Sequence, residues 1–119
     1  MSETSILKRV HIKLVEVGAR MFRNNVGSYE DKYGQWVTYG LCRGSSDLIG
    51  WTPIKITQAM VGKTIAAFTA CEVKDKKGRI TMEQRYFIAA VGGAGGIAFI
   101  CRSEDEAVAR LKEASRRYE

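Results

Sequence analysis

The chain of 119 residues is 45% hydrophobic and 27% charged, and its 19 Lys and Arg against 13 Asp and Glu give a net charge of +6. This length predicts a single domain over residues 1–119, and no apolar run approaches the roughly 18 residues of a membrane span. Because no export signal is visible near Met1, we expect a cytoplasmic protein, and the basic charge favours a polyanionic partner such as nucleic acid.

The cysteine and histidine content limits which side chains could bind a metal or take part in catalysis. Cys42, Cys71 and Cys101 are widely spaced in apolar runs of the β type, unlike a disulfide framework or a zinc site. We therefore predict buried, reduced thiols. His11 is the only histidine, which disfavours a histidine-dependent triad or a histidine-rich metal site. Carboxylates and lysine remain as the candidate reactive groups.

The first predicted element is an amphipathic helix over residues 2–23. Its apolar side chains recur every three or four residues, at Leu7, Val10, Leu14, Val17 and Met21. The opposite face carries Arg9, Lys13, Glu16 and Arg20, which either meet phosphates or form an ordinary solvated surface. Glu3 falls within the apolar stripe, where it either points inward for a functional reason or stabilises the helix start through the macrodipole.

The middle of the chain is predicted to be β-rich. Residues 23–28 read as a turn and the polar stretch to residue 35 as a loop. Strands are expected over residues 36–43 and 47–51, before Pro53 and an ambiguous segment over residues 54–62. The nearly continuous apolar run over residues 64–74 predicts a strand at the centre of a sheet.

The last third of the chain is predicted to be helix, strand and helix after a turn at residues 75–78. Thr81 and Gln84 have the spacing of a capping box, which opens a helix through Val91. The glycine-rich residues 92–96 end this helix and precede a strand over residues 97–101, an order opposite to that of a phosphate-binding loop. Ser103 starts a final helix to about Arg117, which gives the order α-β-β-β-α-β-α.

A candidate reactive site follows from the end of the run over residues 64–74. Residues two apart on a strand point to one face, so Glu72 and Lys74 would emerge side by side, and the fold could bring Asp47 to them. Two carboxylates can hold a hard divalent cation, and an ammonium beside them can orient a water or stabilise charge on a phosphate. The same residues could instead form ordinary surface ion pairs where a strand leaves the core. Gln84 has a structural role in the capping box and could also reach the site.

An ordered set of motifs resembles the virus-type replication-repair nuclease (VRR-NUC) domain, a branch of the PD-(D/E)xK nucleases. The segments that carry the resemblance are residues 44–51, 68–74, 78–79, Gln84, residues 95–97 and Ser103, and residues 22–27 are similar to stand-alone phage members. One departure is Ser46, which stands where the superfamily motif has a proline before the first aspartate. It leaves the metal-binding carboxylate in place but puts the local turn geometry in doubt.

The resemblance implies an α/β fold with a restriction-endonuclease-like core, in which helices flank a central mixed sheet. It implies Asp47, Glu72 and the carbonyl of Val73 as ligands of Mg²⁺ or Mn²⁺, with Lys74 at the attacking water and Gln84 in support. The family also places a glutamate on the first helix, for which Glu3 is our choice and Glu16 the alternative.

The implied activity is hydrolysis of DNA phosphodiester bonds by a structure-selective endonuclease. Stand-alone viral relatives resemble homodimeric enzymes that resolve Holliday junctions, and a two-fold dimer would match such branched DNA. If a phage encodes the protein, it would act in the cytoplasm of the host cell. The alternatives are a monomeric nuclease for flaps or nicks, a DNA-binding module without catalysis, and RNA as the target. Candidate DNA contacts are Arg23, Asn24, Lys76, Lys77 and Arg79, with Arg9, Lys13 and Arg20 as further basic residues.

Overall fold

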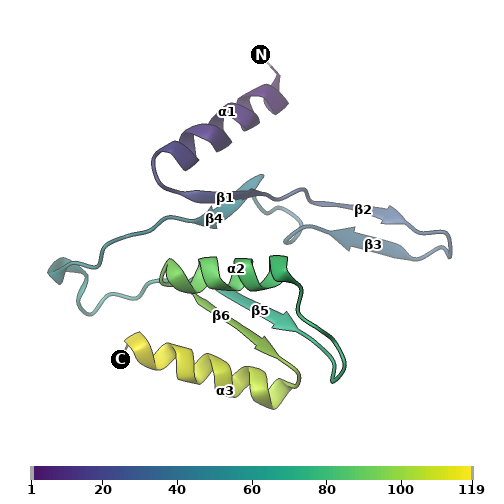
Figure 1. Ribbon diagram of the computed structural model, residues 1–119. Coiled ribbons are helices and arrows are strands. Elements are labelled where there is room, and N and C mark those ends of the chain that lie inside the picture. Colours follow the sequence, from purple (N-terminus) through teal and green to yellow (C-terminus); the bar gives the residue numbers. More distant parts are fainter. Residues whose placement is uncertain (1, 119) are drawn as a thin grey trace. The chain divides into compact units, whose positions relative to one another are not determined.

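The computed structural model describes residues 2–118 (Figure 1), and the chain divides into two compact units at the boundary between Ile54 and Lys55. In chain order the elements are α1 (Glu3–Glu16), β1 (Arg20–Arg23), β2 (Gly27–Glu30), β3 (Trp36–Tyr39), β4 (Leu48–Trp51), the 3₁₀ turn η1 (Gln58–Met60), β5 (Thr69–Val73), α2 (Met82–Gly93), β6 (Ile97–Cys101), α3 (Glu104–Ser115) and the 3₁₀ turn η2 (Arg116–Tyr118). The mixed α/β class is therefore confirmed.

The sheet organisation differs from the expected central sheet. Within residues 2–118 the strands form two-stranded sheets, β1 with β4 and β2 with β3 antiparallel, and β5 with β6 parallel. Two of these strands, β1 and β2, fall where the sequence predicted helix and turn, so the predicted element order was incomplete.

The first helix is shorter than predicted, because it ends at Glu16 rather than near residue 23. Ser2 is the N-cap, and its hydroxyl oxygen accepts a hydrogen bond from the backbone N–H of Ser5. Gly18 follows with a φ of 103°, a left-handed conformation that stops the helix. The three- and four-residue spacing of Val17 and Met21 with the helix stripe was therefore misleading, since Met21 lies in β1.

Strand β1 pairs with β4 over four residues, with Phe22 opposite Ile49. The ring of Phe22 packs against that of Trp51, 5.6 Å between centroids. Gly50 faces Met21, and a Cβ added there would collide with the carbonyl oxygen of Arg20. The close approach of the two strands thus requires a glycine in β4, the strand that begins directly after Asp47.

The hairpin β2–β3 was not foreseen, because its turn lacks a two-residue Asn-Gly or Asp-Gly signal. Its turn is instead organised by Asp31, whose Oδ1 accepts hydrogen bonds from the N–H groups of Tyr33 at 2.8 Å and Gln35 at 2.9 Å. Strand β3 ends at Tyr39, earlier than predicted, because Gly40 adopts a φ of 87°.

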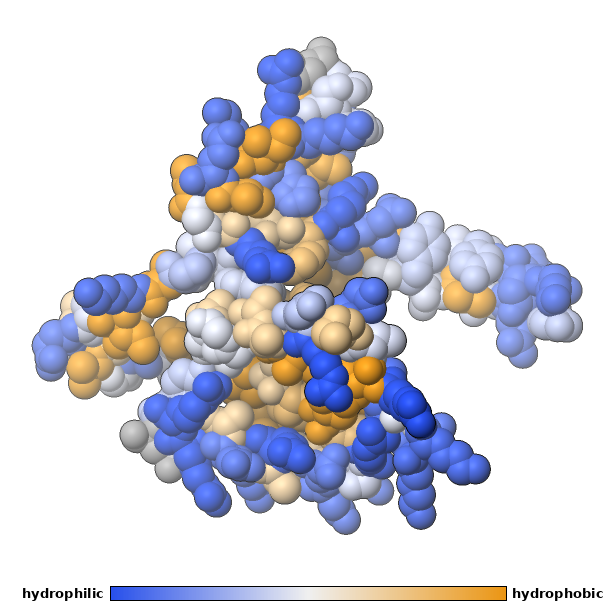
Figure 2. Space-filling model, viewed as in Figure 1, coloured by the Kyte–Doolittle hydropathy of each residue, from blue (hydrophilic) through white to orange (hydrophobic). Residues whose placement is uncertain are grey.

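The second unit is a layered structure in which α2 and α3 lie on opposite sides of the β5–β6 pair (Figure 1). Strand β5 starts only at Thr69, so the predicted strand over residues 64–74 was too long. The buried apolar side chains of the described residues are Val91, Ile97 and Cys101, all in this unit. Figure 2 shows orange apolar residues over the middle of the unit and a blue hydrophilic rim around them. Across residues 2–118, no helix combines the length and the apolar character of a membrane span.

The cysteines are free thiols, as predicted, but only Cys101 is buried, whereas Cys42 and Cys71 are exposed. The sulfur atoms of Cys71 and Cys101 lie 3.5 Å apart across the parallel strand pair. Desolvation raises the pKa of the Cys71 thiol, with further contributions from the Cys101 thiol and the Glu72 carboxylate. Cys71 is therefore held in its protonated form.

Candidate functional site

The predicted pair on β5 forms a compact cluster in the second unit. Glu72 lies opposite Ile100 in the register of β5 and β6, and the alternation of the strand puts Lys74 on the same face. The Oε1 atom of Glu72 accepts a hydrogen bond from Gln84 Nε2 at 2.6 Å and lies 3.4 Å from Lys74 Nζ. The side chains of Lys74 and Glu72 are 19% and 31% exposed, so the cluster is shielded but remains open to solvent.

Gln84 is oriented by the start of α2. Its backbone N–H donates to Thr81 Oγ1 at 3.1 Å, and its Oε1 accepts from the Thr81 N–H at 2.9 Å, which confirms the predicted capping box. Because the amide oxygen is used by the cap, the NH₂ group is the part that faces Glu72. The positive end of the helix dipole adds to the stabilisation of this carboxylate.

The cluster lies at the carboxyl end of the parallel strand pair. Val73 is the last residue of β5 and faces Cys101, and the Lys74 N–H donates to the Cys101 carbonyl at 3.0 Å. This edge is where open parallel sheets bind their ligands. The predicted DNA contacts Lys76, Lys77 and Arg79 follow in the next turn and are exposed.

Asp47 belongs to the first unit, where it is exposed directly before β4. Arg23, a predicted DNA contact, lies beside it. Arg23 Nη1 donates to the Asp47 carbonyl oxygen at 3.1 Å and lies 3.6 Å from the Asp47 carboxylate. This ion pair between partly exposed groups contributes little stability by itself, but it places a cationic group beside the carboxylate.

Asn24, a predicted DNA contact, is 7% exposed, and its side chain is engaged in hydrogen bonds within the unit. Its Nδ2 donates to Ser45 Oγ at 2.7 Å and to the Ser46 carbonyl at 2.9 Å, and its Oδ1 accepts from the Leu41 N–H at 2.9 Å. Its own N–H donates to the Asp47 carbonyl at 2.8 Å. Asn24 therefore ties the loop that carries Asp47 to the end of β1, and it fixes Ser46 where the superfamily motif has proline.

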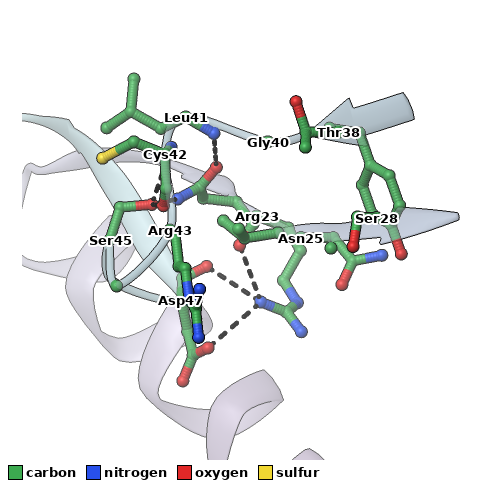
Figure 3. Close-up of a pocket in the computed structure, with 15 residues that line it drawn as sticks. Arg23, Asn25, Ser28, Thr38, Gly40, Leu41, Cys42, Arg43, Ser45 and Asp47 are labelled. Carbon is green, nitrogen blue, oxygen red and sulfur yellow. Dashed lines mark hydrogen bonds and ion pairs between the residues drawn. The ribbon is translucent and has the colours of Figure 1, made fainter. Parts of the chain in front are cut away.

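A hollow of about 820 Å³ lies beside Asp47 within the first unit. Its lining combines the basic side chains of Arg23 and Arg43 with polar residues such as Asn25, Ser28 and Thr38. Figure 3 shows Arg23 pointing toward Asp47 along one wall of this hollow, with Ser28 and Thr38 on the hairpin side. The hollow is thus polar and basic, and its acidic lining residue is Asp47.

The two glutamates considered for the first helix are both exposed on α1. Glu3 lies in the first turn, where its charge favours the helix start. Glu16 forms a surface ion pair with Lys13 at 3.2 Å. The basic residues Arg9 and Arg20 are exposed as well, and Arg20 lies over the Trp51 ring at 5.8 Å.

The structure thus brings together Glu72, Lys74 and Gln84 in one unit, and Asp47 with Arg23 and Asn24 in the other. Sequence reasoning missed the binding of the Asp47 loop by Asn24, although residues 22–27 had been singled out as a motif. It also missed Arg102, which follows β6 and donates to the carbonyls of Asp75 and Gly78. An arginine directly after a strand and before a helix cap was the available signal.

The oxygen atoms of the candidate ligands are of the type that binds a hard cation. The hydrogen bond and the ion pair of the Glu72 carboxylate both involve Oε1. Carboxylate and carbonyl oxygens, such as those of Glu72 and Val73 in the second unit and of Asp47 in the first, are the ligands that Mg²⁺ and Mn²⁺ prefer. Within residues 2–118, no group of three or more His, Cys, Asp or Glu side chains gathers around one point. In each unit, these oxygen donors are of the type that binds the ion implied by the resemblance.

The family of the chain is established by a match between residues 7–105 and the model of the VRR-NUC domain. The matched range covers most of the chain and contains Asp47, Glu72, Lys74 and Gln84. The chain therefore belongs to the VRR-NUC family of nuclease domains, a class of phosphodiester hydrolases that act on DNA. Comparisons with curated proteins and with solved structures each returned no significant match.

Proposed function

We propose that the protein is a structure-selective DNA endonuclease dependent on Mg²⁺ or Mn²⁺, with a restriction-endonuclease-like core. The observation that carries the proposal is the cluster of Glu72, Lys74 and Gln84 at the carboxyl end of β5, inside the range matched by the nuclease family. The spacing of Glu72 and Lys74 is the E-x-K part of the superfamily motif, and Asp47 is its first acidic residue.

Asp47, Glu72 and the carbonyl of Val73 would hold the cation, and Glu3 is a further candidate ligand. When bound, the cation would supply Lewis-acid activation of a water and neutralise charge on the phosphate. Since Asp47 and Glu72 belong to different units, the proposal requires the two units to meet in the active protein. Arg23 would leave Asp47 on cation binding and become free to contact a DNA phosphate.

Lys74 would assist the attacking water or the phosphate, and Gln84 would orient the Glu72 carboxylate. The ammonium of Lys74 lies beside Glu72 and would donate a hydrogen bond to the attacking water or to the scissile phosphate, where negative charge builds up in the transition state. Gln84 holds Oε1 of Glu72 through its NH₂ group, so the remaining oxygen keeps a defined direction. No covalent intermediate is needed for this hydrolysis.

The proposed substrate is branched double-stranded DNA, with a Holliday junction as the preferred form, and the proposed active species is a homodimer in the cytoplasm, that of the host cell if a phage encodes it. The net charge of +6 and the exposed Lys76, Lys77 and Arg79 beside the cluster support binding to the phosphate backbone. The two-fold symmetry of a four-way junction supports two copies of a small domain.

The test is cleavage of labelled four-way junctions, flaps, nicked duplexes and linear duplexes, as DNA and as RNA, with Mg²⁺, Mn²⁺ or EDTA. We expect junction cleavage that requires a divalent cation and is lost in Glu72→Gln and Lys74→Met, whereas Glu113→Gln, an exposed glutamate of α3, cuts normally. Preference for flaps by a species that light scattering finds monomeric would favour the monomeric nuclease. Binding without any cation-dependent cleavage would favour a DNA-binding module.

A further inference from the structure

The turn that follows the Glu72 cluster has a fixed shape. We call residues 75–79 the basic turn. Within it, Asp75 Oδ1 accepts hydrogen bonds from the N–H groups of Lys77 at 3.0 Å and Gly78 at 2.6 Å, and the Gly78 N–H also approaches the Asp75 carbonyl at 3.3 Å. Aspartate commonly organises a turn in this way by imitating a backbone carbonyl. The carboxylate of Asp75 is therefore directed at the backbone of its own turn.

The basic turn is also held from outside by Arg102. Its Nη1 donates to the carbonyl oxygens of Asp75 and of Gly78, the latter at 2.9 Å, so one guanidinium nitrogen joins the two ends of the turn. Arg102 is itself anchored, because its backbone N–H donates to Glu106 Oε1 at 2.8 Å in the first turn of α3. Ser103, the N-cap of α3, accepts from the Glu106 N–H at 3.1 Å and completes this anchor.

The consequence of this clamp is a set of exposed cationic side chains at fixed positions. Lys76, Lys77 and Arg79 are exposed, and the turn begins directly after Lys74. Arg102 Nη1 donates to two carbonyl groups of the turn, so the clamp orders the backbone, while the charge of the exposed guanidinium stays at the surface. A surface that is ordered before binding loses less conformational entropy when it binds.

We propose that Arg102 is a positioning residue, which holds the basic turn in the conformation that binds the DNA phosphate backbone next to the Glu72 cluster. The inference rests on the proposed function for the identity of DNA as the ligand. Arg102 acts through the turn and does not itself contact the DNA. Its removal therefore weakens binding only to the extent that Lys76, Lys77 and Arg79 lose their arrangement.

A double-mutant cycle tests this mechanism on the full chain, with a fluorescent four-way DNA junction in EDTA, so that binding is read without cleavage. By analogy with the loss of phosphate contacts, we expect about tenfold weaker binding for Lys76→Gln/Lys77→Gln/Arg79→Gln and about fivefold for Arg102→Met. The control Arg110→Met removes the same charge from an exposed position of α3 and should change binding less than about twofold. Adding Arg102→Met to the triple variant should cause no further loss.

Additive losses in this cycle would overturn the proposal, because Arg102 would then contact DNA independently. Equal effects of Arg102→Met and Arg110→Met would overturn it too, since only the net charge of the chain would then matter. The proposal also fails if the triple variant binds as tightly as the wild type, or if the wild type shows no binding above background. A wild type that binds but never cuts contradicts the proposed function alone and leaves this inference intact.

A charge-matched pair at Asp75 gives a second reading in case Arg102→Met does not fold. Asp75→Asn and Asp75→Ala remove the same negative charge, but only asparagine keeps an oxygen that can accept from Lys77 and Gly78. We expect Asp75→Asn to bind the junction at least as tightly as the wild type and Asp75→Ala to bind more weakly than Asp75→Asn. Equal binding by the two variants would show that the order of the turn is irrelevant. Faster hydrogen exchange of the Gly78 N–H in Asp75→Ala and Arg102→Met, measured by NMR, should accompany the loss.

Discussion

The two predicted acidic ligands are held by different means. Glu72 is placed by regular structure, on a strand next to the buried Ile97 and Cys101 and under the capped start of α2. Asp47 is placed by an irregular loop, which depends on the hydrogen bonds of one buried asparagine, Asn24. Regular elements fix a side chain through many weak contacts, whereas a loop relies on a few polar contacts that are individually costly to lose. The two carboxylates should therefore respond differently to substitutions around them.

The largest expected effect comes from substitution of the carboxylates themselves, and here we expect the same loss for Asp47 and Glu72. We expect Asp47→Asn and Glu72→Gln each to lower the rate of junction cleavage by about a thousandfold, because both would remove a charge that holds the cation. Binding of Mn²⁺, followed by electron paramagnetic resonance, should weaken in both variants. A variant with normal Mn²⁺ affinity and a normal rate would remove that residue from the proposed site.

The next effect concerns the hydrogen bonds of Asn24, which support the loop of Asp47 but not the strand of Glu72. Asn24→Ala should lower the free energy of unfolding by about 1–3 kcal/mol, because it removes the part-buried hydrogen bonds of the Asn24 side chain to the loop at residues 41–47. Denaturant unfolding measures this change. The neighbouring Asn25→Ala, which alters an exposed side chain, is the matched control and should be nearly neutral. Equal stability of the two variants would mean that Asn24 does not tie the loop.

Two substitutions of Gln84 can separate its role in the helix cap from its hydrogen bond to Glu72. Gln84→Glu keeps an oxygen acceptor for the Thr81 N–H, so thermal stability should change little, but it replaces the donor to Glu72 by a second negative charge. Gln84→Ala loses the capping-box hydrogen bond to the Thr81 N–H and should cost about 1 kcal/mol of stability. We expect cleavage to fall by about tenfold or more in Gln84→Glu. Full activity in that variant would limit Gln84 to the helix cap.

The smallest effect concerns the thiols. Because the pKa of Cys71 is raised, its reactive thiolate form should be scarce near neutral pH. We expect iodoacetamide to modify the exposed Cys42 before Cys71, and the modification of Cys71 to speed up as the pH rises above 9, as followed by mass spectrometry of peptides. Equal rates of modification at pH 8 would contradict the stated cause of the shift.

The parts of the fold that the sequence predicts well depend on short-range rules. The helix starts at Thr81 and Ser103 were predicted because capping is decided within four residues, and the strand β4 because it follows a Gly-Ser turn. The strand β1 was missed because Val17 and Met21 happen to continue the period of α1. The pairing of β1 with β4 joins residues far apart in the chain, and no local pattern contains that information.

The candidate site divides in the same way. The alternation of a strand is enough to put Glu72 and Lys74 side by side, and the capping box already fixed the position of Gln84 on α2. The buried role of Asn24 and the clamp of Arg102 depend on hydrogen bonds across more than twenty residues, so composition and spacing could not reveal them. Whether Asp47 joins Glu72 in one site stays a prediction.

Gly50 illustrates how a purely steric requirement can imitate a catalytic one. Its backbone angles are not of the kind reserved for glycine, yet even a methyl group would push β4 away from Arg20. Such a displacement would reach Asp47, three positions earlier, without altering any reactive atom. In an evolving population this position would stay invariant, and a screen for inactive mutants would recover it among the catalytic residues, although its only task is to leave room.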